Sequence, residues 1–432
     1  MCHRQAHDNK ILAPIRKQRI VGSIGSNMFI EHVRRVTACL VYACAAAALT
    51  PGAHAVDSDS WRVNAFGTLG AAYSSDDDVK FVRDFFQTRG VKGEWSAEPD
   101  SVLGAQFSFR PSPEWEAVLQ LVSRHDSTRD YDPRVTWAYV KFSPNPAFDL
   151  RVGRIGWDAF MRADSRNVGY TYLTVRPPIE YYGILALTHL DGGDVIFRRP
   201  VGDGVLSAKI FAGQADEETP SSAGGTYDLS GSEIVGGYLD WQWRGWQWRL
   251  GATTTKLERE LPDLIPLISG LRGTGFPPLV ELADDIAFEG ARFNNWNLGV
   301  IYERGALQAQ LLYNRRQIES ILLSDGDMWF GLLAYRVGRL TPYLGHARSG
   351  GDSSPSDFAL LGPSSAQALA TGSLFKQRNW LAGLRYDVTN NVDLKLQVDR
   401  IDAPEPQGGL YSADPGWDGD TTVVSIALDF IY

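Results

Sequence analysis

The chain has 432 residues, of which 44 % are hydrophobic, and a formal net charge of −9. This acidic excess argues against a nucleic-acid partner, because nucleic acids attract basic surfaces. Glycine (43 residues) and tryptophan (13) are abundant, and no segment beyond residue 55 is both long and apolar. The composition therefore argues against a bundle of membrane-spanning helices.

The N-terminal region has the features of an export signal. A pair of arginines precedes an apolar run at 36–49, and a small-residue A-x-A site follows at 53–55. This order of a basic, an apolar and a cleavable region is typical of a secretory signal peptide, and the apolar run is too short to span a bilayer. We expect residues 1–55 to be removed. Translation from Met28 would give a leader of ordinary length. The start codon could therefore be wrongly assigned, in which case residues 1–27 would not be part of the protein.

All three cysteines lie in this leader, so the mature chain has no disulfide, thiolate metal site or thiol nucleophile. The leader also carries seven Lys or Arg and two Asp or Glu, which leaves the mature chain with a net charge of about −14. Its three histidines, His125, His189 and His346, are scattered and do not suggest a zinc cluster. We expect neither a metal ion nor a cofactor.

From residue 56 onward, amphipathic segments of about ten residues alternate with turn sequences. The predicted strands are 61–73, 101–110, 115–124, 134–142, 148–155, 187–199, 204–213, 232–243, 246–256, 291–303, 306–316, 329–337, 340–348, 377–388, 392–401 and 421–432. Sixteen is an even number, as a single-chain barrel with both termini on one side requires, and 14 or 18 strands are alternatives. We predict an all-β fold in which 56–432 form one transmembrane antiparallel barrel.

The connections alternate strictly in length. After even-numbered strands they are tight and carry Pro, Gly, Asn or Asp, which tight turns select: 111–114, 143–147, 200–203, 244–245, 304–305, 338–339 and 389–391. After odd-numbered strands they are long: 74–100, 125–133, 157–186, 214–231, 257–290, 317–328, 349–376 and 402–420. Short periplasmic turns and long outer loops are typical of outer-membrane barrels. A soluble sandwich or propeller would explain neither the leader nor the final strand.

The final segment, 422–432, is apolar at every second position and ends on an aromatic residue: Val424, Ile426, Leu428, Phe430 and Tyr432. A strand shows its two faces with period two, so one face suits lipid and the other suits water. On a soluble protein such a strand would be an aggregation-prone edge. In a closed barrel it pairs with the first strand.

Other segments show a similar division, with charges of both signs on the second face. Burying such charges without water would be costly, which indicates an aqueous lumen. By strand parity the basic lumen candidates are Lys141, Arg151, Arg198, Lys209, Arg249, Arg336, Arg348, Arg385 and Lys395. The acidic candidates are Asp149, Asp194, Asp240, Asp393 and Asp399. Arg154 has the opposite parity but lies at a strand end, from which it could swing inward.

Most tryptophans lie near predicted strand ends, as expected for rings at the membrane–water interface. The outer connection 257–288 is unusually apolar. A short helix there could cap the barrel mouth, contact a neighbouring subunit or pack over its own barrel.

On strand number, connection lengths, the hairpin AYVKFSPNPAFDLRVGRI (138–155) and the terminal LDFIY, the chain resembles the trimeric sixteen-stranded porins of Gram-negative bacteria. The resemblance covers 56–432. It implies an outer-membrane homotrimer in contact with lipid and lipopolysaccharide, through which small hydrophilic solutes and ions diffuse passively.

The resemblance also implies that the third long loop folds into the barrel as a constriction, here at 157–186. Its charges are balanced and it is rich in tyrosine, which argues against simple cation or anion selectivity. The predicted pore-lining residues in and around it are Arg151, Arg154, Asp158, Arg162, Asp164, Arg166, Tyr170, Tyr172, Arg176, Glu180, Lys141, Arg198, Arg249 and Arg385.

Two alternatives stay open. The tyrosines could form a slide for sugars, or the arginines a path for small anions, which would make the channel solute-specific. An outer-membrane phospholipase or protease would carry a histidine and a carboxylate at one rim. His125 with Asp126, and His189 with Asp191, are adjacent pairs of that kind, although no diagnostic motif surrounds them.

Overall fold

The computed structural model describes residues 60–87, 90–126, 130–183, 187–220, 225–351, 359–362, 376–403, 412–414 and 416–432. The chain divides into two compact units, Met1–Pro51 and Gly52–Tyr432. The predicted leader and the alternative start at Met28 lie outside the described residues. The described residues all belong to the second unit.

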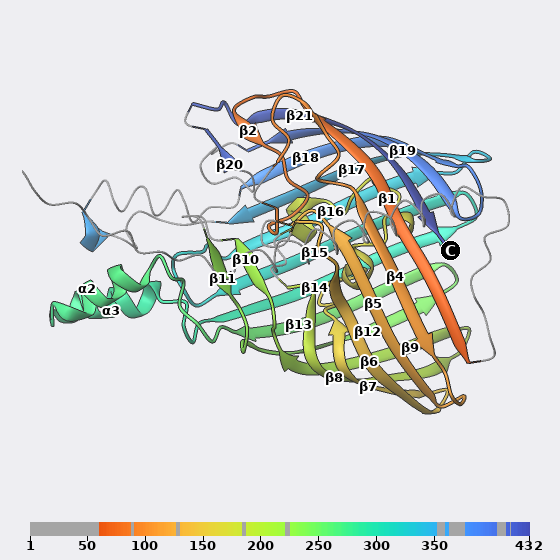
Figure 1. The fold of residues 1–432 in the computed structure, drawn as a ribbon, viewed down its shortest axis with the longest axis horizontal. Helices are drawn as coiled ribbons and strands as arrows, with labels where there is room; N and C mark the ends of the chain where they lie inside the picture. Colours follow the sequence, from red (N-terminus) through yellow and green to blue (C-terminus); the bar gives the residue numbers. More distant parts are fainter. Residues whose placement is uncertain are drawn as a thin grey trace, which may run out of the picture. The chain divides into compact units, whose positions relative to one another are not determined.

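Sixteen strands of the described residues form one closed antiparallel barrel (Figure 1). In chain order they are β1 (Trp61–Ser74), β4 (Val102–Phe109), β5 (Trp115–Arg124), β6 (Arg134–Asn145), β7 (Phe148–Gly156), β8 (His189–Val201), β9 (Gly204–Gln214), β12 (Glu233–Trp243), β13 (Trp246–Lys256), β14 (Arg292–Arg304), β15 (Leu307–Ile318), β16 (Gly326–Tyr335), β17 (Leu340–Gly351), β18 (Gln377–Asp387), β19 (Val392–Asp402) and β21 (Asp420–Ile431).

The barrel closes between its first and last strands. β21 pairs with β1, with Leu428 opposite Leu69, and β1 pairs on its other side with β4. The predicted strand number and the predicted role of the final segment are both confirmed. Each predicted strand overlaps an observed one, with ends that differ by at most three residues.

The smaller elements lie in the long connections. β3 (Trp95–Ser96) pairs with β1, β2 (Val79–Lys80) pairs with β20 (Ser412–Ala413), and β10 (Glu218–Pro220) pairs with β11 (Thr226–Asp228). Figure 1 shows β2, β10, β11 and β20 at one end of the barrel, with the C-terminus at the other. The long and short connections therefore occupy opposite ends, as predicted.

The tight turn between β12 and β13 shows how sequence sets these hairpins. Arg244 and Gly245 have φ of 48° and 90°, and they join Trp243 to its partner Trp246. Two consecutive positive φ values define a type I′ turn, whose twist matches that of the flanking strands. Glycine at the second position adopts this backbone without a side-chain clash.

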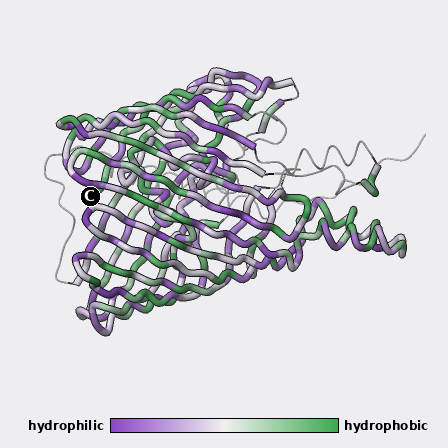
Figure 2. Tube along the Cα trace, turned by 180° about the vertical axis from the view of Figure 1, so that it is seen from behind, coloured by the Kyte–Doolittle hydropathy of each residue, from purple (hydrophilic) through white to green (hydrophobic). Residues whose placement is uncertain are grey.

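The strands carry different chemistry on their two faces. In β19, Leu394, Leu396 and Val398 are exposed on the outer surface, whereas Lys395 and Gln397 between them are buried inside the barrel. Figure 2 shows hydrophobic and hydrophilic residues alternating along the strands in the same way. An apolar outer face and a polar inner face are what a barrel in lipid requires.

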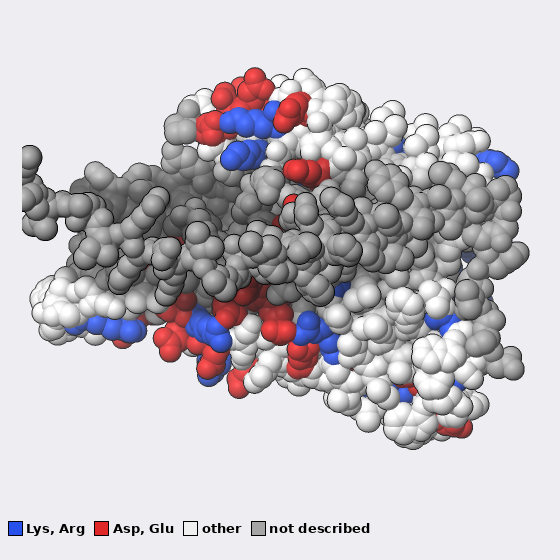
Figure 3. Space-filling view, viewed as in Figure 1, with Lys and Arg blue, Asp and Glu red and all other residues white. Residues whose placement is uncertain are grey.

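Tryptophans on the outer surface lie mainly near the strand ends. Those with exposed side chains on barrel strands are Trp61, Trp115, Trp243, Trp246, Trp248, Trp296 and Trp380. On the face drawn in Figure 3, the charged side chains gather toward the end with the long connections, and the strand surface carries few. Amphipathic rings beside an uncharged band fit a membrane boundary.

The apolar connection after β13 forms a helical hairpin of α2 (Ile265–Gly273) and α3 (Pro277–Ile286). Ile268, Leu271 and Leu282 form its core, against which Ile321 and Leu322 of the connection after β15 pack. The hairpin core therefore packs against other outer connections of its own chain, an arrangement that was not among the three expectations. No helix among the described residues is long and apolar enough to cross a membrane.

Candidate functional site

The connection between β7 and β8, residues 157–188, turns into the barrel and lies against its inner wall; we call it the inner loop. It contains two 3-10 turns, η1 (Ala163–Ser165) and η2 (Gly169–Thr171), and a π-helical turn, η3 (Ile179–Gly183). η2 lies next to β1 and β21, and η3 next to β16, β17 and β18. Residues 184–186 of the predicted constriction lie outside the described part.

At its start the inner loop is fixed to β9 and β12. Asp158 accepts hydrogen bonds from Lys209 Nζ at 2.7 Å and from the Tyr238 hydroxyl at 2.8 Å. Lys209 also lies 3.1 Å from Asp194, which accepts from the guanidinium of Arg151 at 2.9 Å. Burial alone would raise the pKa of Asp158, but Lys209 outweighs it and holds the pKa below its ordinary value. The loop is therefore tied to the wall by a carboxylate that stays charged.

The middle of the loop is held by a buried lysine. Lys395 Nζ donates to the backbone oxygens of Gly169 at 2.8 Å and Thr174 at 3.3 Å, and it lies 2.8 Å from Asp429. A β-carbon on Gly169 would lie 2.1 Å from the Asp429 carboxylate. Only glycine therefore allows the loop backbone to come this close to the wall.

Two more contacts bring the loop near the tight turn after β18. The Tyr170 hydroxyl donates to the Asn390 backbone oxygen at 2.6 Å. Arg385 donates to the Tyr170 backbone oxygen at 2.8 Å, and its guanidinium carbon lies 4.5 Å from the centre of the Tyr170 ring. The loop therefore reaches deep into the barrel, toward the end with the short connections.

The last part of the loop carries a buried ion pair. Arg176 donates to both oxygens of Asp100, at 2.7 and 2.5 Å, and to the Ser425 hydroxyl at 2.5 Å. Burial would raise the pKa of Asp100, but the Arg176 guanidinium outweighs it and the pKa falls below its ordinary value. Bidentate guanidinium–carboxylate pairs are strong and geometrically specific.

Glu180 is buried in η3 without such a cation. Its Oε1 accepts from Gln377 at 2.7 Å. Burial raises the pKa of Glu180 to about 7, and the hydrogen bond from Gln377 offsets only part of this rise. The carboxyl group is therefore partly protonated near neutral pH.

Apolar packing supplements these polar contacts. Phe160, Met161, Tyr181 and Tyr182 of the inner loop belong to one buried cluster with inward side chains of β14 to β18. The wall residues of this cluster are Ile301, Leu312, Met328, Phe330, Leu332, Ala334, Tyr343, Ala347 and Leu381. One side of the barrel interior is thus filled by the loop.

Several charged side chains on β5 to β8 stay in contact with water, although Asp194 of β8 is buried. Lys141 pairs with Glu116 across β6 and β5, and Arg198 donates to Asp149 at 2.7 Å across β8 and β7. The side chain of Arg198 is 40 % exposed and that of Lys141 is 25 % exposed. The side chains of Lys395 and Lys209, under the loop, are 0 % and 1 % exposed.

The structure divides the predicted pore-lining residues by their access to water. Asp158, Arg166, Tyr172, Arg176 and Glu180 are buried in contacts of the inner loop, so their side chains hold the loop rather than face an open pore. Arg249 is buried too, in a bidentate pair with Asp240. Residues with partial or full exposure are Arg151, Lys141, Arg198, Arg385, Arg162, Asp164 and Tyr170.

Two predicted positions are on the outer side of the barrel wall. Arg154 pairs with Asp191 of β8 and with Asp216 of the connection after β9, on the face opposite Arg151. Gly153, with φ of 129°, precedes it. Arg348 shares the exposed face of Leu344, because Tyr343, Ala347 and Ser349 are the inward residues of β17. The parity expected for Arg348 was wrong by one residue.

Several contacts between charged or polar side chains inside the barrel were not predicted from the sequence. Glu116 lies directly opposite Lys141 in the β5–β6 register, so strand parity together with pairing could have identified it. Asp100 precedes β4 and Gln377 begins β18, and at such positions the alternation of a strand does not predict whether a side chain points inward. Their roles depend on where the inner loop lies.

The histidines considered for catalysis have other partners. His125 Nδ1 lies 3.0 Å from Asp130, and Asp126 instead pairs with Arg134 at 3.0 Å. The Thr188 hydroxyl lies 3.0 Å from His189 Nδ1. Within the described residues, no group of three or more His, Cys, Asp or Glu side chains is arranged to hold a metal ion.

Sixteen two-faced strands and a loop folded inside them define a channel-forming barrel. The profile of the Gram-negative porin family matches residues 43–430, and the chain belongs to this family. It is an outer-membrane protein. No curated protein matches its sequence.

Solved porin structures share the fold at low sequence identity. OmpF of Salmonella typhi, solved with daunomycin, is 11 % identical with a TM-score of 0.54; the match covers 88 % of this chain and 100 % of OmpF. The anion-selective porin of Comamonas acidovorans is 13 % identical with a TM-score of 0.52, covering 86 % and 100 %. The trimer form of OmpT, an outer-membrane protein of Vibrio cholerae, is 11 % identical with a TM-score of 0.51, covering 87 % and 100 %.

Proposed function

We propose that this porin is a water-filled channel for passive diffusion of small hydrophilic solutes and ions, and not an enzyme. The passage follows the inner faces of β5 to β8, past the edge of the inner loop. One observation carries this proposal: Lys141 of β6 and Arg198 of β8 are open to water, whereas Lys209 of β9 and Lys395 of β19 are sealed beneath the loop.

The charges along this passage support modest ion selectivity. Three pairs of opposite charges lie across β5 to β8: Glu116 with Lys141, Asp149 with Arg198, and Arg151 with Asp194. A ring of one sign would favour ions of the other sign, whereas paired charges largely cancel at a distance. The tyrosines give little support to a sugar slide, because Tyr172, Tyr181 and Tyr182 are buried.

We further propose a homotrimer that is exported by cleavage after Ala55. The export signal in the sequence supports the cleavage, and the trimeric OmpT structure supports the assembly. Chemical crosslinking of the protein in native membranes, together with N-terminal sequencing of the mature chain, tests both points. Recovery of monomers alone, or of a chain that begins elsewhere, would contradict them.

Planar-bilayer recording tests the channel. The purified protein is expected to form open, ohmic pores, and replacing residues 163–178 of the inner loop with a short Gly-Ser linker is expected to raise single-channel conductance. A wild-type protein that forms no open pores would contradict the channel. Unchanged conductance in the loop variant would contradict the role of the loop as a constriction.

A further inference from the structure

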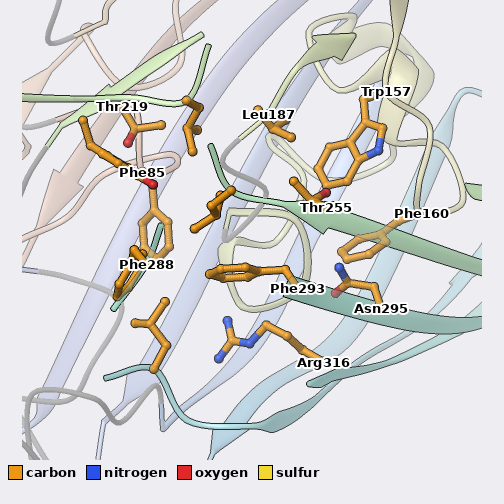
Figure 4. A pocket seen from close by; sticks show the side chains of 14 residues that line it. Phe85, Trp157, Phe160, Leu187, Thr219, Thr255, Phe288, Phe293, Asn295 and Arg316 are labelled. Atoms are coloured by element: carbon orange, nitrogen blue, oxygen red, sulfur yellow. The ribbon is translucent and has the colours of Figure 1, made fainter. Parts of the chain in front are cut away.

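An apolar pocket lies inside the barrel at the end with the long connections; we call it the mouth pocket. It has a volume of about 240 Å³. Its wall is formed by inward side chains of β13, β14 and β15, and its other sides by the inner loop and the outer connections (Figure 4). Aromatic residues from four separate segments reach it: Phe85, Trp157, Phe160, Tyr227, Phe288 and Phe293.

The lining combines these rings with a single charged side chain. Among the described residues that line the pocket, Arg316 of β15 is the one Lys, Arg, Asp or Glu. It is 7 % exposed, and one of its N–H groups donates to the Ser324 backbone oxygen at 3.1 Å. Figure 4 shows its guanidinium group directed toward Phe293 and Phe288, with Trp157 and Leu187 on the opposite side.

The polar groups beside Arg316 on the inner wall are neutral, and the carboxylate of Asp325, in the outer connection after β15, also attracts its guanidinium. Asn314 of β15 donates to Asn295 of β14 at 3.2 Å on the same inner face, and Thr255 lies on β13. The indole N–H of Trp157, which is 4 % exposed, has no acceptor within hydrogen-bonding distance in the described part of the chain. The pocket therefore offers hydrogen-bond donors and positive charge, set among apolar rings.

These features select the chemistry of a ligand. Apolar cavities of roughly 150 Å³ can take up a benzene molecule, so the mouth pocket has room for one or two fused rings. A sugar would need several polar partners that the rings do not supply, and an organic cation would meet the Arg316 charge. A guanidinium presents its N–H groups in a fork that fits a carboxylate.

We propose that the mouth pocket binds amphipathic carboxylates, with the ring among Phe293, Phe288 and Trp157 and the carboxylate on Arg316. The site lies against the inner loop at the end with the long connections, and β9 and β12 separate its wall from β8. It would concentrate aromatic acids at the entrance, a property beyond general diffusion of hydrophilic solutes.

Binding of 2-naphthoate to the mature protein in zwitterionic nanodiscs tests the proposal, with empty nanodiscs as the blank and 2-naphthylmethanol as the uncharged probe. We expect saturable binding of both compounds, and Arg316→Gln is expected to weaken naphthoate about tenfold or more, as loss of a charge-assisted hydrogen bond would. The same variant should change 2-naphthylmethanol binding by less than about twofold, because its contacts are apolar.

Arg315→Gln is the matched control, since Arg315 lies on the outer face of the same strand and pairs with Asp327 at 2.9 Å. It should leave both affinities unchanged. If Arg316→Gln does not fold, Leu323→Glu in the outer connection replaces it and is expected to weaken naphthoate selectively by charge repulsion. Absence of saturable naphthoate binding to the wild type, or equal naphthoate affinity in the folded test variant and the wild type, would overturn the proposal. Neither readout depends on conductance.

Discussion

At the residue scale, inward charges fall into two groups that differ in their access to water. Lys395, Asp393 and Asp429 form a fully buried cluster under the inner loop, whereas Lys141 and Glu116 pair in the passage. Removing one partner of a buried cluster leaves a charge without water or a counterion. Exposed pairs contribute little, because water and salt screen them.

Lys395→Met is therefore expected to lower the free energy of unfolding by about 3–5 kcal/mol, since it leaves the buried Asp429 without its cationic partner and removes the donor to Gly169. Asp393 keeps a partner in Arg385 at 3.0 Å. Urea titration of the protein folded in lipid vesicles measures this change. Lys141→Met is the control and should cost less than about 1 kcal/mol, because Glu116 keeps a partner in Arg110 at 3.2 Å. Equal effects of the two variants would contradict the division into buried and exposed charges.

Glu180 gives the inner loop a pH dependence of a defined sign. Its pKa in the folded protein is about 7, above the ordinary 4.5, so the folded state holds the proton more tightly than the unfolded state. Stability from this group is therefore present at low pH and is lost as pH rises through about 7. Acidification has the opposite effect through Asp100. Because the pKa of Asp100 is lowered in the folded protein, its contribution to folding stability is lost at low pH.

Glu180→Gln is expected to stabilise the folded protein at pH 8 by on the order of 2 kcal/mol more than at pH 5, because glutamine never has to lose a proton in the buried site. It also keeps an oxygen that can accept from Gln377. Urea titrations at both pH values measure the difference. A stability gain that is the same at pH 5 and pH 8 would show that the glutamate proton is not involved.

At the scale of elements, the inner loop is positioned by close backbone approach as much as by side chains. Gly169 touches the wall where Thr68 donates to Asp429, and a β-carbon there would lie 2.4 Å from the Thr68 hydroxyl. The loop has room to move only away from this wall, toward the passage.

Gly169→Ala is therefore expected to shift the loop inward, to reduce single-channel conductance and to cost about 1–3 kcal/mol, as overpacking does elsewhere. Bilayer recording and urea titration measure the two effects. Gly331→Ala is a suitable control, because a β-carbon at residue 331 would have its nearest neighbouring atom 3.9 Å away. Wild-type conductance and stability in Gly169→Ala would argue against tight docking of the loop.

At the scale of the whole molecule, the barrel separates two electrostatic environments by a single layer of strands. Arg198 points into the passage beside Asp149, whereas Arg154, one strand away, lies on the outer side with Asp191 and Asp216. Only the first arginine can act on permeating ions, because the field that steers them is that of the aqueous lumen.

Arg198→Glu is expected to shift the reversal potential in a KCl gradient toward cation selectivity, with roughly a twofold or greater change in the permeability ratio. Arg154→Glu should leave the reversal potential at its wild-type value. A shift of equal size in both variants would place the passage elsewhere.

The barrel could be predicted from local features of the amino-acid sequence. Period-two alternation, turn residues such as Arg244-Gly245 and the final aromatic strand are local signals, and each strand had to satisfy lipid on one side and water on the other. Parity also identified Arg151, Lys141 and Arg198 as inward residues, because alternation is strict within a regular strand.

Which inward charges meet water depends on the three-dimensional packing of the inner loop. Arg176 and Glu180 lie in irregular backbone, where no periodicity predicts direction, and their partners Asp100 and Gln377 are distant in the sequence. The inner loop covers one wall of the barrel interior and leaves the other wall open. Its position results from the sum of many weak contacts across the interior. No local pattern encodes such a sum, and the mouth pocket, assembled from several connections, depends on it as well.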